Sequence, residues 1–213
     1  MEKETRDPVG AGARPLRRDA ELNRRRIMQA AREVFAVRGL QATLNDVAHH
    51  AGLGVGTVYR KFPDKETLAV AVFTGELDEI AEMARAALAE GDAFVALAGF
   101  LEGALERAAH NRGLRELMRL GEFGGEGFAR ARREIAGHCE SLVDSARVQG
   151  ALRDGVTAAD IAPIAAMIDA VLALPESGSA ALWRRYLAII LDGLRARPQG
   201  QSPLPVPAPG GGA

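Results

Sequence analysis

The stretch TLNDVAHHAGLGVGTVYRKFPDKETL, residues 43–68, carries the start and stop signals of two short helices separated by a tight turn. Thr43, with Asp46 three residues later, is typical of a capping box at the start of a helix. Gly52 stands where a left-handed residue ends that helix at little steric cost. Pro63 ends the second helix, because the residue before a proline avoids the helical region. The spacing predicts a helix-turn-helix, followed by the start of a longer helix.

The second of these helices has the composition of an element that enters the major groove of DNA. It begins with small or polar residues and ends with aromatic and basic ones, namely Gly54, Gly56, Thr57, Tyr59, Arg60 and Lys61. Such a helix brings its N-terminal end to the base edges while its flanks hold phosphates. The alternative is an ordinary helical hairpin inside an all-α domain.

The longer run QATLNDVAHHAGLGVGTVYRKFPDKETL, residues 41–68, resembles the DNA-binding signature of TetR-type transcriptional regulators. Upstream, IMQAAREVFAVRGL, residues 27–40, resembles the first helix of that family. The resemblance is specific over about residues 24–70 and only architectural beyond them. It departs at Gly54, where the family usually has Ser or Thr, so a hydroxyl that reaches phosphate is missing. It implies an all-α fold of nine helices, with a three-helix head that binds DNA and a helical body that binds ligand and dimerises.

We predict four parts along the chain. A disordered basic arm occupies residues 1–22, and a helix-turn-helix DNA-binding domain occupies residues 23–68, with Asn23 as the cap of its first helix. A ligand-binding and dimerisation domain follows at residues 69–197, and a disordered tail rich in proline and glycine at residues 198–213. The arginines of the arm suggest contacts in the minor groove, but a solvated tail is the simpler interpretation.

Formal charge is distributed unevenly along the chain. Residues 1–65 contain 13 Lys and Arg against 8 Asp and Glu, and residues 66–213 contain 14 against 20, so a net charge of −1 hides +5 against −6. This predicts that only the N-terminal third faces a polyanion, here double-stranded DNA. No stretch is apolar enough to span a membrane, and no signal peptide is visible. A single cysteine, Cys139, excludes an internal disulfide and fits a cytoplasmic protein.

The motifs of common enzyme classes are missing from the sequence. It contains no phosphate-binding glycine loop with Lys-Ser/Thr, no G-x-S-x-G, no H-E-x-x-H and no C-x-x-C. His110, His138 and Cys139 lack the spacing of metal ligands, so we expect neither a metal nor another cofactor. The chain is therefore predicted not to be an enzyme. An unrecognised enzyme, and a ligand-binding protein that has lost DNA binding, are the alternatives.

The DNA contacts are expected from the helix-turn-helix and its surroundings. We place Val55, Gly56 and Thr57 near base edges. The residues expected at phosphates are Arg24, Arg25, Thr43, Tyr59, Lys61 and Lys65. Among them, Lys65 takes the position of the phosphate-contacting lysine of the family that the sequence resembles.

The last two helices are predicted to form a homodimer, because each is apolar over more of its circumference than one core requires. The residues expected in the interface are Trp183, Tyr186, Leu187, Ile190 and Leu194. Asp169 lies in the apolar run MIDAVLAL and needs a partner, for which we suggest Arg184 or Arg185 across the interface. An ordinary core within one chain is the alternative.

A small hydrophobic effector is expected inside the C-terminal body, partly because the resembled family carries a ligand cavity there. Methionines and aromatic residues suit an adaptable apolar pocket. The residues expected to line it are Phe94, Leu97, Phe100, Leu101, Met118, Phe123, Phe128 and Met167. The alternative is that these residues fill a core. Together these expectations describe a DNA-binding regulator, most simply a ligand-responsive repressor that binds a palindromic operator as a homodimer.

Overall fold

The computed structural model describes residues 13–119, 124–174, 182–206 and 208. These ranges form nine α-helices, two 3-10 helices and no strand, which confirms the predicted all-α fold. In chain order the elements are α1 (Ala13–Arg38), η1 (Gly39–Gln41), α2 (Leu44–Ala51), α3 (Val55–Lys61), α4 (Lys65–Ala87), α5 (Ala93–Ala109), α6 (Arg112–Arg119), α7 (Glu126–Val148), η2 (Ala158–Asp160), α8 (Ile161–Leu172) and α9 (Leu182–Leu194).

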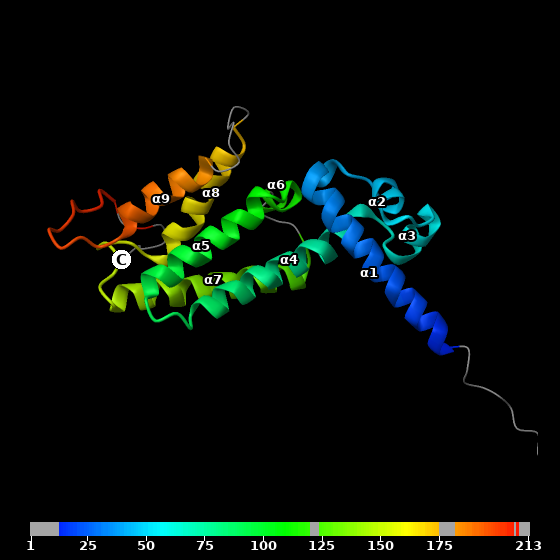
Figure 1. The fold of residues 1–213 in the computed structure, drawn as a ribbon, viewed down its shortest axis with the longest axis horizontal. Coiled ribbons are helices and arrows are strands. Elements are labelled where there is room, and N and C mark those ends of the chain that lie inside the picture. The colour runs from blue at the N-terminus through cyan, green and yellow to red at the C-terminus, as the bar shows by residue number, and fades with distance from the viewer. Residues whose placement is uncertain (1–12, 120–123, 175–181, 207, 209–213) are drawn as a thin grey trace, which may run out of the picture.

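The molecule is elongated, with a small head at one end and a larger body at the other (Figure 1). Helices α1, α2 and α3 form the head, and α5 to α9 form most of the body. Helix α4 runs from the head into the body, where it lies along α7. The N-terminal end of α1 points away from the body. This layout makes α4 and α6 the elements of the body that approach the head.

The helix-turn-helix forms as the sequence predicts. Thr43 caps α2 through a complete capping box with Asp46, and Gly52 ends the helix in the left-handed conformation with φ 61°. Gly54 is the N-cap of α3, and Phe62 is its C-cap. The crossing of α2 and α3 is close because small and apolar side chains fill it. Ala48 and Val58 are both fully buried there.

The first helix is longer than predicted, because α1 begins at Ala13 and not at Asn23. Residues 13–22 are therefore helical and not a disordered arm, while residues 1–12 lie outside the described residues. Asn23 therefore lies within α1 and is not its N-cap. The proline that suggested disorder, Pro15, falls in the first helical turn, where the missing N–H costs no hydrogen bond.

The body is a layered bundle in which helices contact neighbours distant in sequence. Helix α4 packs on α7 and α5, and α8 packs on α5 and α9. Gly113 shows how closely α6 approaches α1 and α4. A Cβ atom at this position would lie 2.7 Å from Cζ of Phe73 and 2.9 Å from the carbonyl oxygen of Phe35.

The described part of the C-terminal tail, which was predicted to be disordered over residues 198–213, has no helix and is mostly exposed, with two contacts to the body. Arg153 donates to the carbonyl of Ser202 at 2.5 Å, and Leu204 would contact a Cβ placed on Gly155 at 3.3 Å. Residues 207 and 209–213 lie outside the described residues.

Cys139 is a buried core residue, and burial raises the pKa of its thiol to about 11. A thiol with so high a pKa is inert at neutral pH, so the structure gives it a packing role. In the described ranges no three His, Cys, Asp or Glu side chains gather as metal ligands do. None of the helices there is both long and apolar enough to cross a bilayer.

Candidate DNA-binding site

The start of α3 is exposed and carries only small or medium-sized side chains. Val55 has 43% of its surface exposed, Gly54 and Gly56 are exposed, and Thr57 is half-buried. Val58, one residue later, is fully buried against α2 and fixes how the helix lies. Three of four consecutive positions at the start of α3 are therefore open and carry no large side chain, as a close approach to base edges requires.

The other end of α3 is exposed, aromatic and basic. Tyr59 is 47% exposed, and Arg60 and Lys61 are exposed beside it. These side chains flank the open start of the helix without covering it. A phenol and two cations in this position suit the phosphates on the rim of a groove.

The arginines of α1 near this surface are all engaged within the head. Arg24 lies over the ring of Phe62, with its guanidinium carbon 5.4 Å from the ring centroid. Arg26 donates to the carbonyl of Ala51 at 3.1 Å and thereby holds the C-terminal end of α2. Arg25 lies 3.4 Å from the carboxylate of Glu21, and both side chains are well exposed. Because α1 begins at Ala13, these arginines lie within the helix and not at its positive N-terminal end.

Thr43 makes a structural contact within the head. Its hydroxyl donates to the Asp46 carboxylate at 2.7 Å, and its backbone amide donates to the same oxygen at 2.9 Å. These bonds from Thr43, aided by Arg38, hold the pKa of Asp46 below its ordinary value. The one proton of the Thr43 hydroxyl is donated to Asp46 in this structure, and the phosphate contact of Thr43 stays a prediction.

Lys65 lies at the start of α4 and ties it to the turn after α1. Its ammonium group donates to the carbonyl of Leu40 at 2.7 Å. The backbone amide of Leu40 donates to the Glu116 carboxylate of α6 at 2.7 Å. The backbone of Leu40 is thus bonded to both α4 and α6. Lys65 remains exposed, and its ammonium keeps further protons for a phosphate.

Three carboxylates around the helix-turn-helix are used in caps and internal pairs. Asp46 completes a capping box and pairs with Arg38, and Asp64 caps α4 by accepting from the amide of Thr67 at 2.6 Å. Glu33 lies 2.5 Å from the His50 ring nitrogen, a contact that lowers the pKa of Glu33. This leaves the surface around α3 dominated by the exposed cations Arg60 and Lys61.

Residues 27–72 match the family of bacterial regulatory proteins called the tetR family, and residues 92–196 match the SbtR-like C-terminal domain of transcriptional regulators. A solved TetR transcriptional regulator from Streptomyces coelicolor is 30% identical, with a TM-score of 0.60. That match covers 81% of this chain and 98% of the other chain. The chain belongs to the TetR family of transcriptional regulators. Its helix-turn-helix is the DNA-binding part, and its family is one of regulators and not of enzymes.

Three further comparisons place this TetR-family regulator among its relatives. A solved TetR regulator from Mycobacterium vanbaalenii is 32% identical, with a TM-score of 0.57, over 85% of this chain and all of the other. An HTH-type transcriptional regulator of Staphylococcus aureus strain USA300 is 39% identical over 64 residues. That stretch is 30% of this chain and spans only 35% of the length of the curated relative. The solved regulator FadR of Bacillus subtilis, in complex with stearoyl-CoA, is 19% identical with a TM-score of 0.62 and shares the fold.

The structure of this TetR-family regulator divides the predicted effector residues into two sets. One set is buried in the body and comprises Phe94, Leu97, Phe100, Leu101 and Phe128. Met118 and Met167 are instead 47% and 53% exposed, and Phe123 lies outside the described residues. The buried set belongs to α5 and α7. The two methionines, on α6 and α8, are not part of that interior.

The predicted dimer residues of this TetR-family regulator also divide. Trp183, Leu187 and Leu194 are buried within their own protomer and are not free for an interface, whereas Tyr186 is 43% exposed and Ile190 half-buried. The reason is helical periodicity, because the face of α9 that packs on α5 and α8 takes every third or fourth residue. Sequence analysis missed the exposed Ile189 beside Tyr186.

The predicted partner of Asp169 was wrong. Its carboxylate accepts from Arg119 of α6 at 2.6 Å and lies 3.6 Å from Arg115, both in the same chain. Arg184, which we had suggested, pairs with Glu106 of α5. The pairing of Asp169 joins α8 to α6 and needs no second subunit.

Proposed function

We propose that this chain represses transcription by binding a palindromic operator as a homodimer in the cytoplasm, and that a small hydrophobic effector releases it. The observation that carries the proposal is the open start of α3, flanked by Tyr59, Arg60 and Lys61. In this proposal Val55, Gly56 and Thr57 approach base edges. Tyr59, Lys61 and Lys65 hold phosphates, and Arg24 and Arg25 lie beside them.

The outer faces of α8 and α9 support the homodimer. On α8 the exposed positions are small or apolar, namely Ala162, Pro163, Ala166, Met167 and Ala170. On α9, Tyr186 and Ile189 are exposed, at 43% and 57%. Small residues at four-residue spacing allow close helix packing, and an exposed apolar face of this kind suits a partner surface. Two copies related by a twofold axis would present two α3 helices to a twofold-symmetric DNA site.

The contact between α6 and the head supports regulation by an effector. Glu116 of α6 accepts from the amide of Leu40 at 2.7 Å and from Arg112 at 2.6 Å. Partial burial opposes ionisation of Glu116, but these bonds outweigh it and hold its pKa below the ordinary value. Gly39, with φ 63°, leaves space for this carboxylate, because a Cβ there would lie 2.4 Å from Oε2 of Glu116. A shift of α6 is therefore transmitted to the turn that sets the position of α2.

DNA binding is tested by gel-shift titration with the DNA upstream of the chain's own gene, alongside scrambled DNA of equal length. We expect a complex with the upstream DNA, and a weaker complex for Tyr59→Phe with all sequences alike, because a phosphate contact carries no sequence information. Sedimentation at micromolar concentration tests the dimer. A monomer there, or equal affinity for both DNAs, would contradict the proposal.

Regulation is tested with Glu116→Ala and the matched control Glu134→Ala, an exposed residue of α7 paired with Arg130. A thermal-shift screen of hydrophobic compounds first identifies a stabilising compound. We expect Glu116→Ala to keep operator binding but to need more of that compound for release, because α6 no longer holds Leu40. If both variants respond as the unsubstituted chain does, the transmission through Glu116 is wrong.

A further inference from the structure

The buried indole of Trp183 has an unsatisfied hydrogen-bond donor. Trp183 is the only tryptophan of the chain, and it is 1% exposed. Its Nε1–H finds no hydrogen-bond partner among the described residues. Nearly all buried donors in proteins are paired, so an unpaired one indicates a water or ligand that completes the site.

The ring of Trp183 is held in a fixed orientation. The guanidinium of Arg184 lies over it, 4.7 Å from the ring centroid. Arg184 is in turn anchored to α5, where it pairs with Glu106 and lies 3.7 Å from Glu102. Because Trp183 is also 1% exposed, its N–H does not reach solvent in this structure.

The surroundings of Trp183 favour a neutral ligand. Trp183 lies in α9, which packs on α5 and α8. The buried apolar residues of these three helices include Phe100, Leu105, Ile164, Ile168 and Leu187. The charged side chain that lies over the indole, Arg184, already pairs with Glu106.

We propose that Trp183 Nε1–H is the polar contact of the effector site, and that the effector is an uncharged, largely apolar molecule with a carbonyl-type acceptor. The inference rests on the ligand-responsive part of the proposed function and names its ligand class. Helix α8, which packs on α9, is linked to the head through α6. Asp169 of α8 is bonded to Arg119 of α6, and Glu116 on the same helix holds Leu40.

The test uses a matched pair of probes that differ in one atom group. 2-Octanone carries the acceptor, and 2-methyl-1-octene has the same shape with a methylene group in place of the oxygen. Octanoate and octylamine provide charged comparisons. In the full-length chain we expect 2-octanone to bind about tenfold more tightly than the alkene, equivalent to about 1.4 kcal/mol. The two charged probes should bind no better than the alkene, as judged by tryptophan emission and thermal shift.

Trp183→Phe keeps an aromatic side chain but removes the N–H. We expect the affinity for 2-octanone to fall about tenfold, to that of the alkene, with the alkene affinity unchanged. The thermal midpoint of the free variant reports whether it folds. Independently of any variant, the single indole N–H resonance of the ¹⁵N-tryptophan-labelled chain should move downfield with 2-octanone and not with the alkene.

Two outcomes would overturn the assignment. Equal affinity for the ketone and the alkene would show that the indole N–H donates no hydrogen bond to the ketone. If neither probe binds, the N–H is satisfied only by a buried water. Gel shifts without probe separate this result from the DNA-binding proposal. If the operator is bound but the probes fail, only the proposed effector site is wrong. If the probes bind as expected but the operator is not bound, the proposed repressor function is wrong.

Discussion

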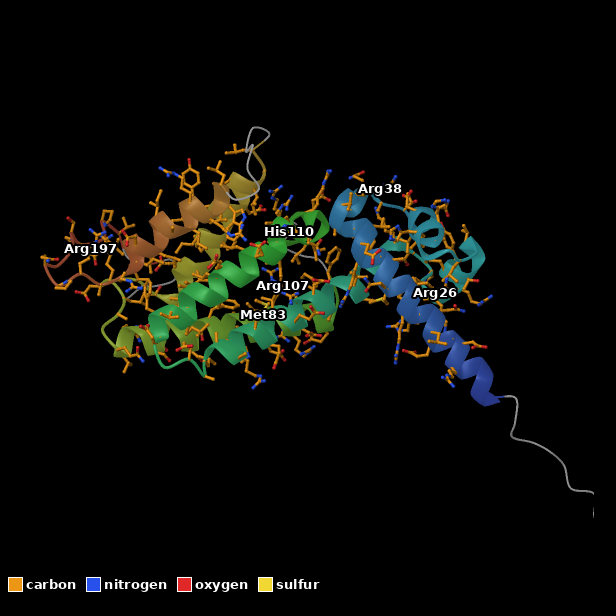
Figure 2. All side chains as sticks on the ribbon, viewed as in Figure 1. Arg26, Arg38, Met83, Arg107, His110 and Arg197 are labelled. Carbon is orange, nitrogen blue, oxygen red and sulfur yellow. The ribbon has the colours of Figure 1, made fainter. Side chains whose placement is uncertain are left out.

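The head and the body use their charged side chains for different purposes. In the head, the carboxylates Asp46 and Asp64 cap helices, and the cations Arg60 and Lys61 are left exposed around α3. In the body, charges are paired between helices. Arg107 of α5, for example, binds Glu79 of α4 at 2.8 Å and donates to the sulfur of Met83 at 3.0 Å (Figure 2). The difference indicates that charge in the head serves an external polyanion, whereas charge in the body fixes how helices lie against each other.

Removing the core of the head should have the largest effect and should separate the two regions. Phe62 is buried beneath Arg24, so Phe62→Ala leaves a cavity and loses the stacking contact. We expect the free energy of unfolding to fall by about 3–5 kcal/mol, with loss of DNA binding but retention of the dimer. Urea unfolding and sedimentation measure both. The control is Val37→Ala, because Val37 is exposed. If Phe62→Ala also makes the dimer dissociate, the head and the body do not fold independently.

Breaking a charge pair of the body should have a smaller effect on stability and none on the DNA contacts. Asp169→Asn weakens the pairs with Arg119 and Arg115, of which Arg115 is largely buried. We expect a loss of about 1–3 kcal/mol in urea unfolding, with operator affinity unchanged. The matched control is Asp144→Asn, whose exposed pair with Arg147 should contribute almost nothing. Equal losses for both variants would contradict the interhelical role of the Asp169 pair.

A change of charge in the head should appear in the salt dependence of DNA binding. Lys61→Ala removes an exposed cation, so the slope of log affinity against log salt concentration should decrease by about 1. Its thermal midpoint should stay the same. Arg130→Ala removes a cation of the body that is paired with Asp78 and Glu134. It should leave the slope unchanged, and a change there would show that the body also faces DNA.

The smallest expected effect is the pH dependence of the α2 cap. Hydrogen bonds from Thr43 hold the pKa of Asp46 below its ordinary value of 3.8, so ionised Asp46 stabilises the folded state. This contribution is complete above the unfolded pKa and is lost as the pH falls through the folded pKa. The difference in thermal midpoint between the unsubstituted chain and Asp46→Asn should therefore shrink from neutral pH to about pH 3. A constant difference would mean that the carboxylate charge contributes nothing to the cap.

The head was predictable from sequence because its signals are local. Thr43 and Asp46 stand three residues apart, and Gly52 has the left-handed conformation that its position after Ala51 predicts. The start of α1 was missed, because residues 13–22 were assigned to a disordered arm. Pro15 lies in the first turn, where helices tolerate proline. Local patterns therefore identified the elements of the head better than their ends.

The pairings of the body were not predictable because they join residues far apart in the chain. Arg119 and Asp169 are separated by 50 positions, and Leu40 and Glu116 by 76. Helical periodicity shows that Trp183 is on an apolar stripe, but not whether that stripe is covered by its own chain or by a partner. The structure decides this by packing α9 on α5 and α8, which left only part of the predicted interface exposed.

The close contact between Glu116 and Gly39 limits which heads and bodies of related regulators can be joined in a chimera. Gly39 is left-handed and leaves space for a carboxylate from the body, so head and body are fitted to each other at a backbone position. A chimera that joins this head to a foreign body would leave the Leu40 amide without its acceptor, unless the new α6 supplies one. Conversely, this body placed under a head with a side chain at position 39 would meet a steric block. Heads and bodies of such regulators should therefore be exchangeable only in pairs that keep this glycine and this carboxylate together.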